Sequence, residues 1–236
     1  MKNPSGSKDY LGHIHPITQA SEELCGILRE IGFSIVEGPE IETDHYNFEA
    51  LNFPADHPAR DMQDTFWLKG ADKKLLRTHT SPVQIRYMES HKPPFAIAVP
   101  GKVFRNEATD ASHEAQFFQL EGLYVDKEVS MANLKGVLLH LFKKYFGEDA
   151  EIRFRPSFFP FVEPGVEVDM QYKGKWLEMM GAGLVHPNVL SAAGVDPKKW
   201  QGFAFGGGID RFIAIKLGLD DIRHLYTGDL RLINQF

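Results

Sequence analysis

Hydrophobic side chains recur at helical spacing in three stretches of the chain. Apolar residues follow this spacing through residues 17–31, where Pro16 stands in the first turn and Gly32 follows the last. The same spacing runs through residues 130–146 and 209–217. A helix with apolar residues along one side buries that side, so we expect three amphipathic helices that pack on other elements.

Between these stretches, apolar and polar residues alternate over short segments, as they do in strands with one buried face. Turn signals such as Lys173-Gly174 join neighbouring segments directly, which favours hairpins over strand–helix–strand units. The pattern predicts an α+β fold with an antiparallel β-sheet flanked by helices. We expect strands at 33–36, 61–68, 75–78, 96–99, 116–125, 151–154, 166–172, 175–180 and 202–208, a turn at Pro100-Gly101, and a surface segment near the active site at 47–60.

Length and composition narrow the class of protein. The 236 residues, 43% hydrophobic and 25% charged, are typical of a globular protein with one large domain or two small ones. Residues 1–12 are polar and predict a flexible leader before a domain at 13–236. The net charge of −6 excludes a general basic field, so an RNA partner would need local patches or another subunit. A single cysteine excludes an internal disulfide, and no apolar run approaches a membrane span, so we expect a cytoplasmic location.

One polar loop and the strand after it concentrate reactive side chains. Arg105 and Glu107 are two residues apart, and Phe117, Gln119 and Glu121 follow with the same spacing, so each set shares a strand face. A guanidinium suits phosphate oxygens, an aromatic ring can stack on a base, and carboxylates accept hydrogen bonds from an amine. The set predicts a site for a nucleotide beside an ammonium group. The alternative is a solvated polar face.

Several strings resemble a known enzyme family. The strings FRNE and GGGIDR are similar to motifs 2 and 3 of class II aminoacyl-tRNA synthetases. Three further strings, HTSP, QLEG and RPSFFPFVEPG, resemble the α subunit of bacterial phenylalanyl-tRNA synthetase, and the match runs from about His15 to the C-terminus. These strings occupy residues 104–107, 206–211, 79–82, 119–122 and 155–165.

The resemblance implies an activity and its partners. It implies that residues 13–236 are a catalytic domain that activates L-phenylalanine with ATP and Mg²⁺, forms Phe-AMP, and transfers phenylalanine to tRNA(Phe). In the family the α subunit works with a β subunit as an α2β2 assembly. Residues 17–36 resemble motif 1, which implies an α–α contact. The family's N-terminal arm, which touches tRNA, has no counterpart in this sequence, so the resemblance implies adenylation more directly than charging.

The resemblance also implies roles for the nucleotide side of the site. Arg105 would bind the α-phosphate, and Glu107 would accept a hydrogen bond from the adenine amine. Phe117 would stack on one face of adenine, while Arg211 would cover the other face and reach the γ-phosphate. His113 would contact the departing phosphates. Arg105 and Arg211 are thus the catalytic candidates.

The remaining candidates belong to the amino acid and the metal. The family pattern implies Glu163 as a metal ligand, although a surface carboxylate is the alternative, and Ser81 could instead cap the helix that begins at Pro82. Compared with many relatives, Phe118 replaces histidine and Asp210 replaces glutamate. The residues implied to surround phenylalanine are Trp67, His79, Ser81, Gln119, Glu121, Phe159, Phe161, Val162, Gly181, Gly183, Ala204 and Gly206; Phe159 and Phe161 are expected on one strand face.

Two other functions stay open from the sequence. The chain could be a class II paralogue that activates an aromatic amino acid for an acceptor other than tRNA. It could also be a synthetase-like interaction module without catalysis. The intact set of Arg105, Glu107, Gln119, Glu121 and Arg211 argues against the second of these.

Overall fold

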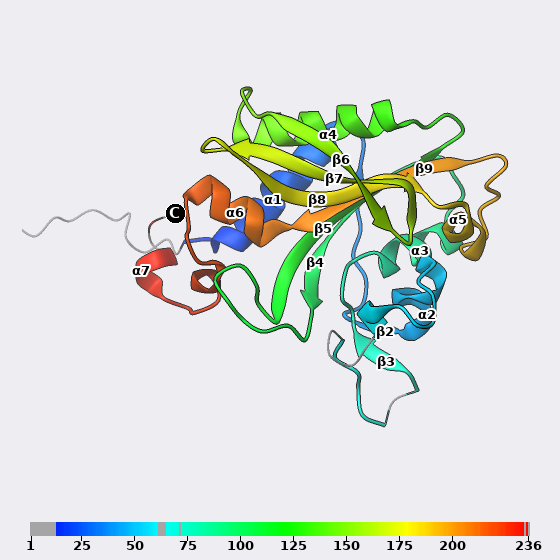
Figure 1. Cartoon of the computed structure of the whole chain (residues 1–236), viewed down its shortest axis with the longest axis horizontal. Coiled ribbons are helices and arrows are strands. Elements are labelled where there is room, and N and C mark those ends of the chain that lie inside the picture. Colours follow the sequence, from blue (N-terminus) through cyan, green and yellow to red (C-terminus); the bar gives the residue numbers. More distant parts are fainter. Residues whose placement is uncertain (1–12, 61–64, 71, 234, 236) are drawn as a thin grey trace, which may run out of the picture.

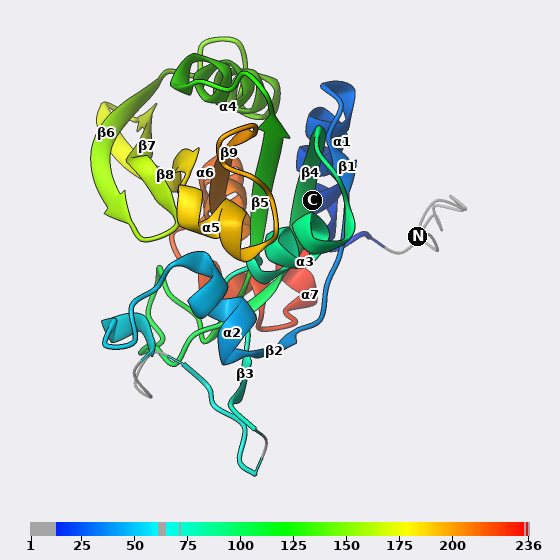
Figure 2. The same ribbon diagram turned by 90° about the vertical axis from the view of Figure 1, so that its right-hand side faces the viewer.

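The computed structural model describes residues 13–60, 65–70, 72–233 and 235. Its centre is a seven-stranded sheet in the order β1-β4-β5-β9-β8-β7-β6, in which every neighbouring pair is antiparallel except β1 and β4. The strands follow an arc from β1 to β6 (Figure 2). Their bounds are β1 Ser34–Ile35, β4 Phe95–Phe104, β5 Gln116–Asp126, β9 Gln201–Gly208, β8 Lys175–Val185, β7 Val162–Tyr172 and β6 Ile152–Phe159. The predicted α+β fold with an antiparallel sheet and flanking helices is confirmed.

Three helices pack against one another and against one face of this sheet (Figure 1). They are α1 Pro16–Glu30, α4 Met131–Phe146 and α6 Ile209–Leu217, which agree with the three predicted stretches. Their ends have ordinary local causes. Pro16 starts α1, the Ser130 hydroxyl accepts from the Asn133 N–H at the start of α4, and Gly147 ends α4 at a φ of 112°.

A second group of elements lies against the other face. Its parts that contribute buried side chains to the core on that face are α3 Pro82–Ser90, α5 Pro187–Ala192 and the 3₁₀ turn at Glu49–Leu51. The remaining parts are α2 Asp44–Asn47, the 3₁₀ turn at Pro58–Arg60, and the pair β2 Ile41–Thr43 with β3 Lys74–Leu76, which extends away from the sheet (Figure 2). The alternation of side chains divides the core between the two faces. Ile97 and Val99 of β4 belong to this side, whereas Ala98 between them belongs to the helical side.

The chain after α6 contains a 3₁₀ turn at Ile222–Leu225 and the short helix α7 Leu230–Ile233. Among the described residues, none of the helices is both long and apolar enough to cross a membrane. The predicted leader at residues 1–12 lies outside the described residues.

The turn predicted at Pro100-Gly101 is wrong, because β4 runs through both residues. Ala98 accepts a hydrogen bond from the Val36 N–H, 3.0 Å away, so it faces the β1 edge. Pro100 is two residues later and faces the same edge, where β1 has already ended. The missing N–H of proline therefore removes no bond between strands.

Two other local predictions are only partly confirmed. Residues 47–60 lie beside the cavity described below, as predicted, and residues 54–56 and 58 are exposed, but the side chains of Phe48 and Leu51 are buried in the core. Of the strand predicted at 61–68, residues 61–64 lie outside the described part. The rest pairs with β3 as predicted, but only through one antiparallel bridge, between Trp67 and Leu75, with a backbone hydrogen bond on either side. The principal partner of β3 is β2, which the sequence pattern did not indicate.

Candidate active site

A cavity of about 730 Å³ opens over β5, β8 and β9. This volume is in the usual range for small-molecule sites. The β4–β5 loop, the β6–β7 turn and α6 complete its walls. Fourteen of the predicted site residues line it: His79, Ser81, Arg105, Glu107, His113, Phe117, Gln119, Glu121, Phe159, Phe161, Gly181, Ala204, Gly206 and Arg211.

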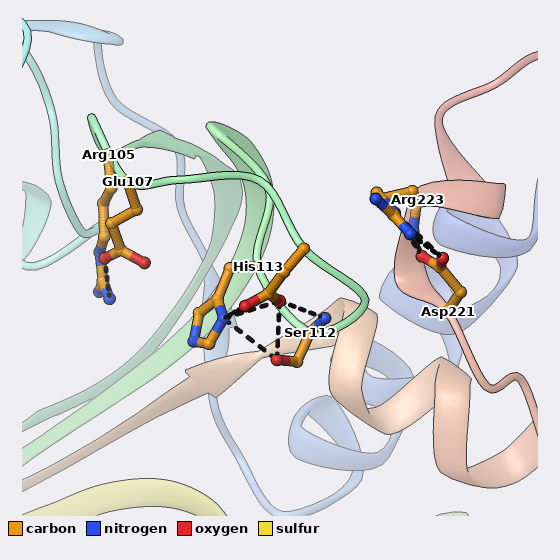
Figure 3. A network of polar contacts seen from close by, with 7 residues as sticks. Arg105, Glu107, Ser112, His113, Asp221 and Arg223 are labelled. Atoms are coloured by element: carbon orange, nitrogen blue, oxygen red, sulfur yellow. Dashed lines mark hydrogen bonds and ion pairs between the residues drawn. The ribbon is translucent and has the colours of Figure 1, made fainter.

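Cationic and aromatic groups meet at one end of the cavity. The Arg105 Nε donates to the Thr78 carbonyl at 3.1 Å, and the guanidinium carbon lies 5.0 Å from the centre of the Phe117 ring. Arg105 and Glu107 point along the same side of their loop, with a nitrogen and an oxygen 3.9 Å apart (Figure 3). Arg211 lies in the first turn of α6 and forms no ion pair with the other described residues.

His113 extends this end along the exposed loop (Figure 3). Its Nδ1 lies 2.9 Å from an oxygen of Asp110 and 3.1 Å from the hydroxyl of Ser112. The Ser112 N–H, together with the imidazole, holds the pKa of Asp110 well below its usual range. The imidazole is therefore held on the loop by a carboxylate that stays ionised at neutral pH.

The opposite end of the cavity contains a buried carboxylate. Glu121, on β5, is 5% exposed and accepts hydrogen bonds from the Thr80 N–H at 3.1 Å, the Ser81 hydroxyl at 2.7 Å and the Gln84 amide at 2.7 Å. Burial raises the pKa of Glu121, and these donors act in the opposite direction. Ser81 occupies the N-cap position of α3, as the capping alternative predicted, but its hydroxyl donates to Glu121 and makes no capping hydrogen bond.

Two neighbouring side chains keep polar atoms without a partner. Both ring nitrogens of His79 and the Oε1 of Gln119 are buried and form no hydrogen bond within the described part of the chain. Burial lowers the pKa of His79 to about 3, so its imidazole is neutral at physiological pH. Because buried polar atoms normally have partners, these atoms in the cavity wall suit a polar ligand.

Aromatic rings form the third part of the cavity. Phe159 and Phe161 are stacked with their centres 5.8 Å apart, and Phe53 lies 5.8 Å from Phe161. Phe161 is in the turn after β6, so the turn, and not a shared strand face, brings this pair together. A Cβ at Gly181 would lie 2.9 Å from the Phe159 ring, and Ala204 adds only a methyl group to the wall.

Comparison with known proteins identifies the family of the chain. The sequence model of the tRNA synthetase class II core domain (F) family matches residues 3–236. The chain belongs to this family. It is 52% identical over 226 residues to the phenylalanine–tRNA ligase α subunit of Prochlorococcus marinus strain MIT 9313, covering 96% of the chain and 67% of the relative. It is 53% identical to the Bacillus subtilis α subunit over 245 residues, covering 98% and 71%.

The fold of this class II domain also agrees with a solved structure. Pyrrolysyl-tRNA synthetase from Desulfitobacterium hafniense superposes with a TM-score of 0.71 at 20% identity, covering 90% of the chain and 73% of that protein. At this identity the likeness concerns the fold alone. The resemblance that the sequence strings indicated is confirmed by the family and by its α-subunit relatives.

Four residues predicted for the class II site do not line the cavity. Trp67 packs behind Phe48, with ring centres 6.4 Å apart. Val162 and Gly183 pack against each other behind the wall. The Glu163 side chain is 76% exposed, and its Oε2 lies 3.4 Å from the Nε2 of His186. Trp67, Val162 and Gly183 can therefore act on a ligand in this cavity only through their neighbours.

The sequence interpretation missed several lining residues. Phe48 and Phe53 enter from the segment at 47–60, whose lack of periodicity hid them. Leu219, Asp220 and Ile222 follow α6 and also line the cavity; no sequence signal marked them. Asp210, which the sequence analysis named only as a departure from the family pattern, lines the cavity as well. In the described residues, His, Cys, Asp and Glu side chains form no group of three or more that could hold a metal.

Proposed function

We propose that this chain is the catalytic core of a phenylalanine–tRNA ligase α subunit, and that its cavity joins L-phenylalanine to ATP. One observation carries the proposal. A single cavity contains the Arg105–Phe117 pair at one end, and a buried carboxylate and stacked phenylalanine rings in its other parts. An anionic nucleotide, an ammonium group and an aromatic side chain need these three kinds of surroundings.

The reaction joins two anions, so charge neutralisation is the main task of the site. An oxygen of the phenylalanine carboxylate attacks the α-phosphorus of ATP, the bond from that phosphorus to the bridging oxygen breaks, and pyrophosphate leaves with its electron pair. Arg105 would neutralise the α-phosphate and Arg211 the outer phosphates. No protein nucleophile is needed, because held reactants and fixed positive charge lower the barrier.

The adenine would bind between Phe117 and Arg211. The Arg105 guanidinium lies over the Phe117 ring, which places the base site and the α-phosphate site next to each other. Glu107, on the same loop, would accept a hydrogen bond from the adenine amine. His113 would meet the departing pyrophosphate after exchanging its contact with Asp110.

The amino acid would bind at the other end. Glu121 and the Gln119 Oε1 would accept from its ammonium group, and the His79 imidazole and the Ser81 hydroxyl would contact its polar atoms. The side chain would enter between Phe159, Phe161 and Ala204. Gly206 leaves the space that the Glu121 side chain occupies. A Cβ at residue 206 would lie 2.6 Å from the Glu121 Cγ, so a larger residue would displace the carboxylate.

Mg²⁺ would accompany ATP and screen its phosphates. It is usually held by phosphate oxygens and water with one or two carboxylates, so a cluster of protein ligands is not required. Glu163, the predicted ligand, lies outside the cavity and has no cluster of carboxylates around it in the described chain. A metal at Glu163 would take its other ligands from outside these residues.

The proposal has four further parts: transfer of phenylalanine to tRNA(Phe), a β subunit in an α2β2 assembly, an α–α contact through α1 and β1, and a cytoplasmic location. They rest on the α-subunit relatives and are tested separately from adenylation. No observation on the cavity favours an acceptor other than tRNA or a non-catalytic role.

The test is exchange of labelled pyrophosphate into ATP, measured with the chain alone and with a β subunit supplied. We expect exchange that depends on phenylalanine, is weak with tyrosine, and is lost in Arg105→Ala. The control is Arg153→Ala, which removes an arginine on β6 that pairs with Asp169 outside the cavity. Absence of phenylalanine-dependent exchange in the assembled protein contradicts the proposal. Charging of tRNA(Phe) then tests the second step.

A further inference from the structure

The segment at 219–226 forms a wall of the cavity. It leaves α6 at Gly218, whose φ of 69° turns the chain back toward the β4–β5 loop. Leu219, Asp220 and Ile222 line the nucleotide end. The segment could cover this end passively, or it could set the positions of the residues that hold the nucleotide. Two contacts decide between these roles.

The first contact joins the segment to the loop that carries Arg105. The Ile222 N–H donates to the Ala111 carbonyl at 3.0 Å, in the middle of the loop. Arg223 is held beside it by two hydrogen bonds from its Nε to the Asp221 carboxylate, 2.9 and 3.0 Å long (Figure 3). After Asp221, the carboxylates of Asp110 and Glu114 on the loop also raise the pKa of Arg223. The Ile222–Ala111 hydrogen bond therefore joins the segment to the loop.

The second contact passes through a buried carboxylate. Asp210 is 3% exposed; one of its oxygens accepts from the Phe118 N–H at 2.8 Å and the other from the Tyr226 hydroxyl. No arginine, lysine or histidine of the described residues forms an ion pair with it. These two donors are thus its principal support.

Asp210 and the backbone N–H that it accepts from are each next in sequence to a residue of the proposed nucleotide site. Phe118 follows Phe117 on β5, and Asp210 precedes Arg211 on α6. Asp210 therefore links β5, which carries Phe117, to α6, which carries Arg211, and these are the two residues proposed to enclose adenine. Without the Tyr226 hydroxyl, one buried oxygen would lose its donor, and the carboxylate would have to rotate or draw in water. Either response changes the relative position of Phe117 and Arg211.

We propose that Tyr226 is a positioning residue for the nucleotide: through Asp210 it fixes the Phe117 and Arg211 walls, while Ile222 fixes the loop that carries Arg105. This inference rests on the proposed function. It predicts an effect on ATP and not on phenylalanine, because the amino acid end is built from Glu121 and its donors at the start of α3.

Tyr226→Phe tests the proposal by pyrophosphate exchange in the assembled protein. We expect the KM for ATP to rise at least tenfold while the KM for phenylalanine stays within twofold. The matched control is Tyr124→Phe, which also removes a hydroxyl that donates to an aspartate, Asp126 at 2.9 Å, but does not line the cavity. Both KM values of the control should stay within twofold of those of the wild type.

A purely structural role would lower the melting temperature and leave the two KM values unchanged, and this result overturns the proposal. Equal rises in both KM values overturn it as well. If Tyr226→Phe does not fold, Ile222→Pro decides by the same criteria. It removes the N–H that reaches Ala111, and proline suits this first position of the 3₁₀ turn because Asp221 before it is extended. Wild-type protein without phenylalanine-dependent exchange would instead contradict the proposed function.

Discussion

Replacing Gly101 with alanine tests whether the buried Arg77 organises the site. Arg77 is 3% exposed and donates to three backbone carbonyls, those of Lys102 at 2.8 Å, Gly38 at 3.0 Å and Pro39 at 3.3 Å. Burial lowers its pKa. Its own backbone joins the same elements, because the Arg77 carbonyl accepts from the Phe104 N–H at 2.9 Å. A Cβ at residue 101 would lie 2.3 Å from its guanidinium.

The contact sets the expected magnitude. To reach an ordinary carbon–nitrogen separation, the guanidinium would have to move by about 1 Å, which breaks part of its directional bonding. Hydrogen bonds to a charged group contribute about 1.5–3 kcal/mol each. Loss of one or two of the three bonds therefore predicts that Gly101→Ala lowers the free energy of unfolding by about 3 kcal/mol. Exchange activity should fall as well, since Thr78, next to Arg77, holds Arg105.

Denaturant unfolding measures the effect, and two comparisons make it specific. Gly136→Ala on α4, where an added Cβ meets no atom within 4 Å, should raise the free energy of unfolding by about 0.5–1 kcal/mol. In an Arg77→Ala background, Gly101→Ala should cost less than about 0.5 kcal/mol, because the obstructing group is gone. An equal cost with and without Arg77 would refute the reasoning.

Three other variants test separate parts of the cavity. Ala204→Gly enlarges the aromatic pocket, so exchange with ring-substituted phenylalanine analogues should rise about tenfold relative to phenylalanine; unchanged discrimination would exclude Ala204 from the pocket lining. Glu121→Gln removes the charge proposed to meet the ammonium group, so the kcat/KM for phenylalanine should fall about 100-fold with the KM for ATP unchanged. The pKa of His79 is about 3 in the folded protein, so the imidazole takes up a proton between pH 7 and pH 5 only in the unfolded chain. The free energy of unfolding should therefore fall by about 1–2 kcal/mol over this range. His79→Asn should remove this pH dependence, as measured by denaturant unfolding.

The sequence predicted the elements whose causes are local. The strand β9 at Gln201–Gly208 and the helix α6 at Ile209–Leu217 agree with the predicted bounds to within one residue, because alternation changes to helical spacing at the glycines between them. The end of α4 at Gly147 is equally local. Periodicity is a property of neighbouring residues, so it can be read without knowing what they pack against.

The errors occur where a distant segment decides the outcome. Pro100 is a turn signal by itself, and only the early end of β1 makes it acceptable within β4. Phe48 precedes a single 3₁₀ turn and Leu51 is its last residue. The turn is too short to show a period, yet both side chains are buried against other parts of the chain. Candidate ligand contacts came from motifs, whereas Tyr226 and Arg77 act across long sequence separations and left no local pattern.

The buried polar groups of the cavity divide into two kinds. The Glu121 carboxylate has three donors and that of Asp210 has two, so the protein itself fixes both before any ligand binds. In contrast, His79 and Gln119 keep polar atoms without a partner in the described chain. An unsatisfied buried group costs about 1–3 kcal/mol, and a ligand that supplies the missing partners offsets this cost. Because these atoms lie at the end proposed for the amino acid, the arrangement would favour an ammonium–carboxylate ligand there over a merely aromatic one that leaves them unpaired.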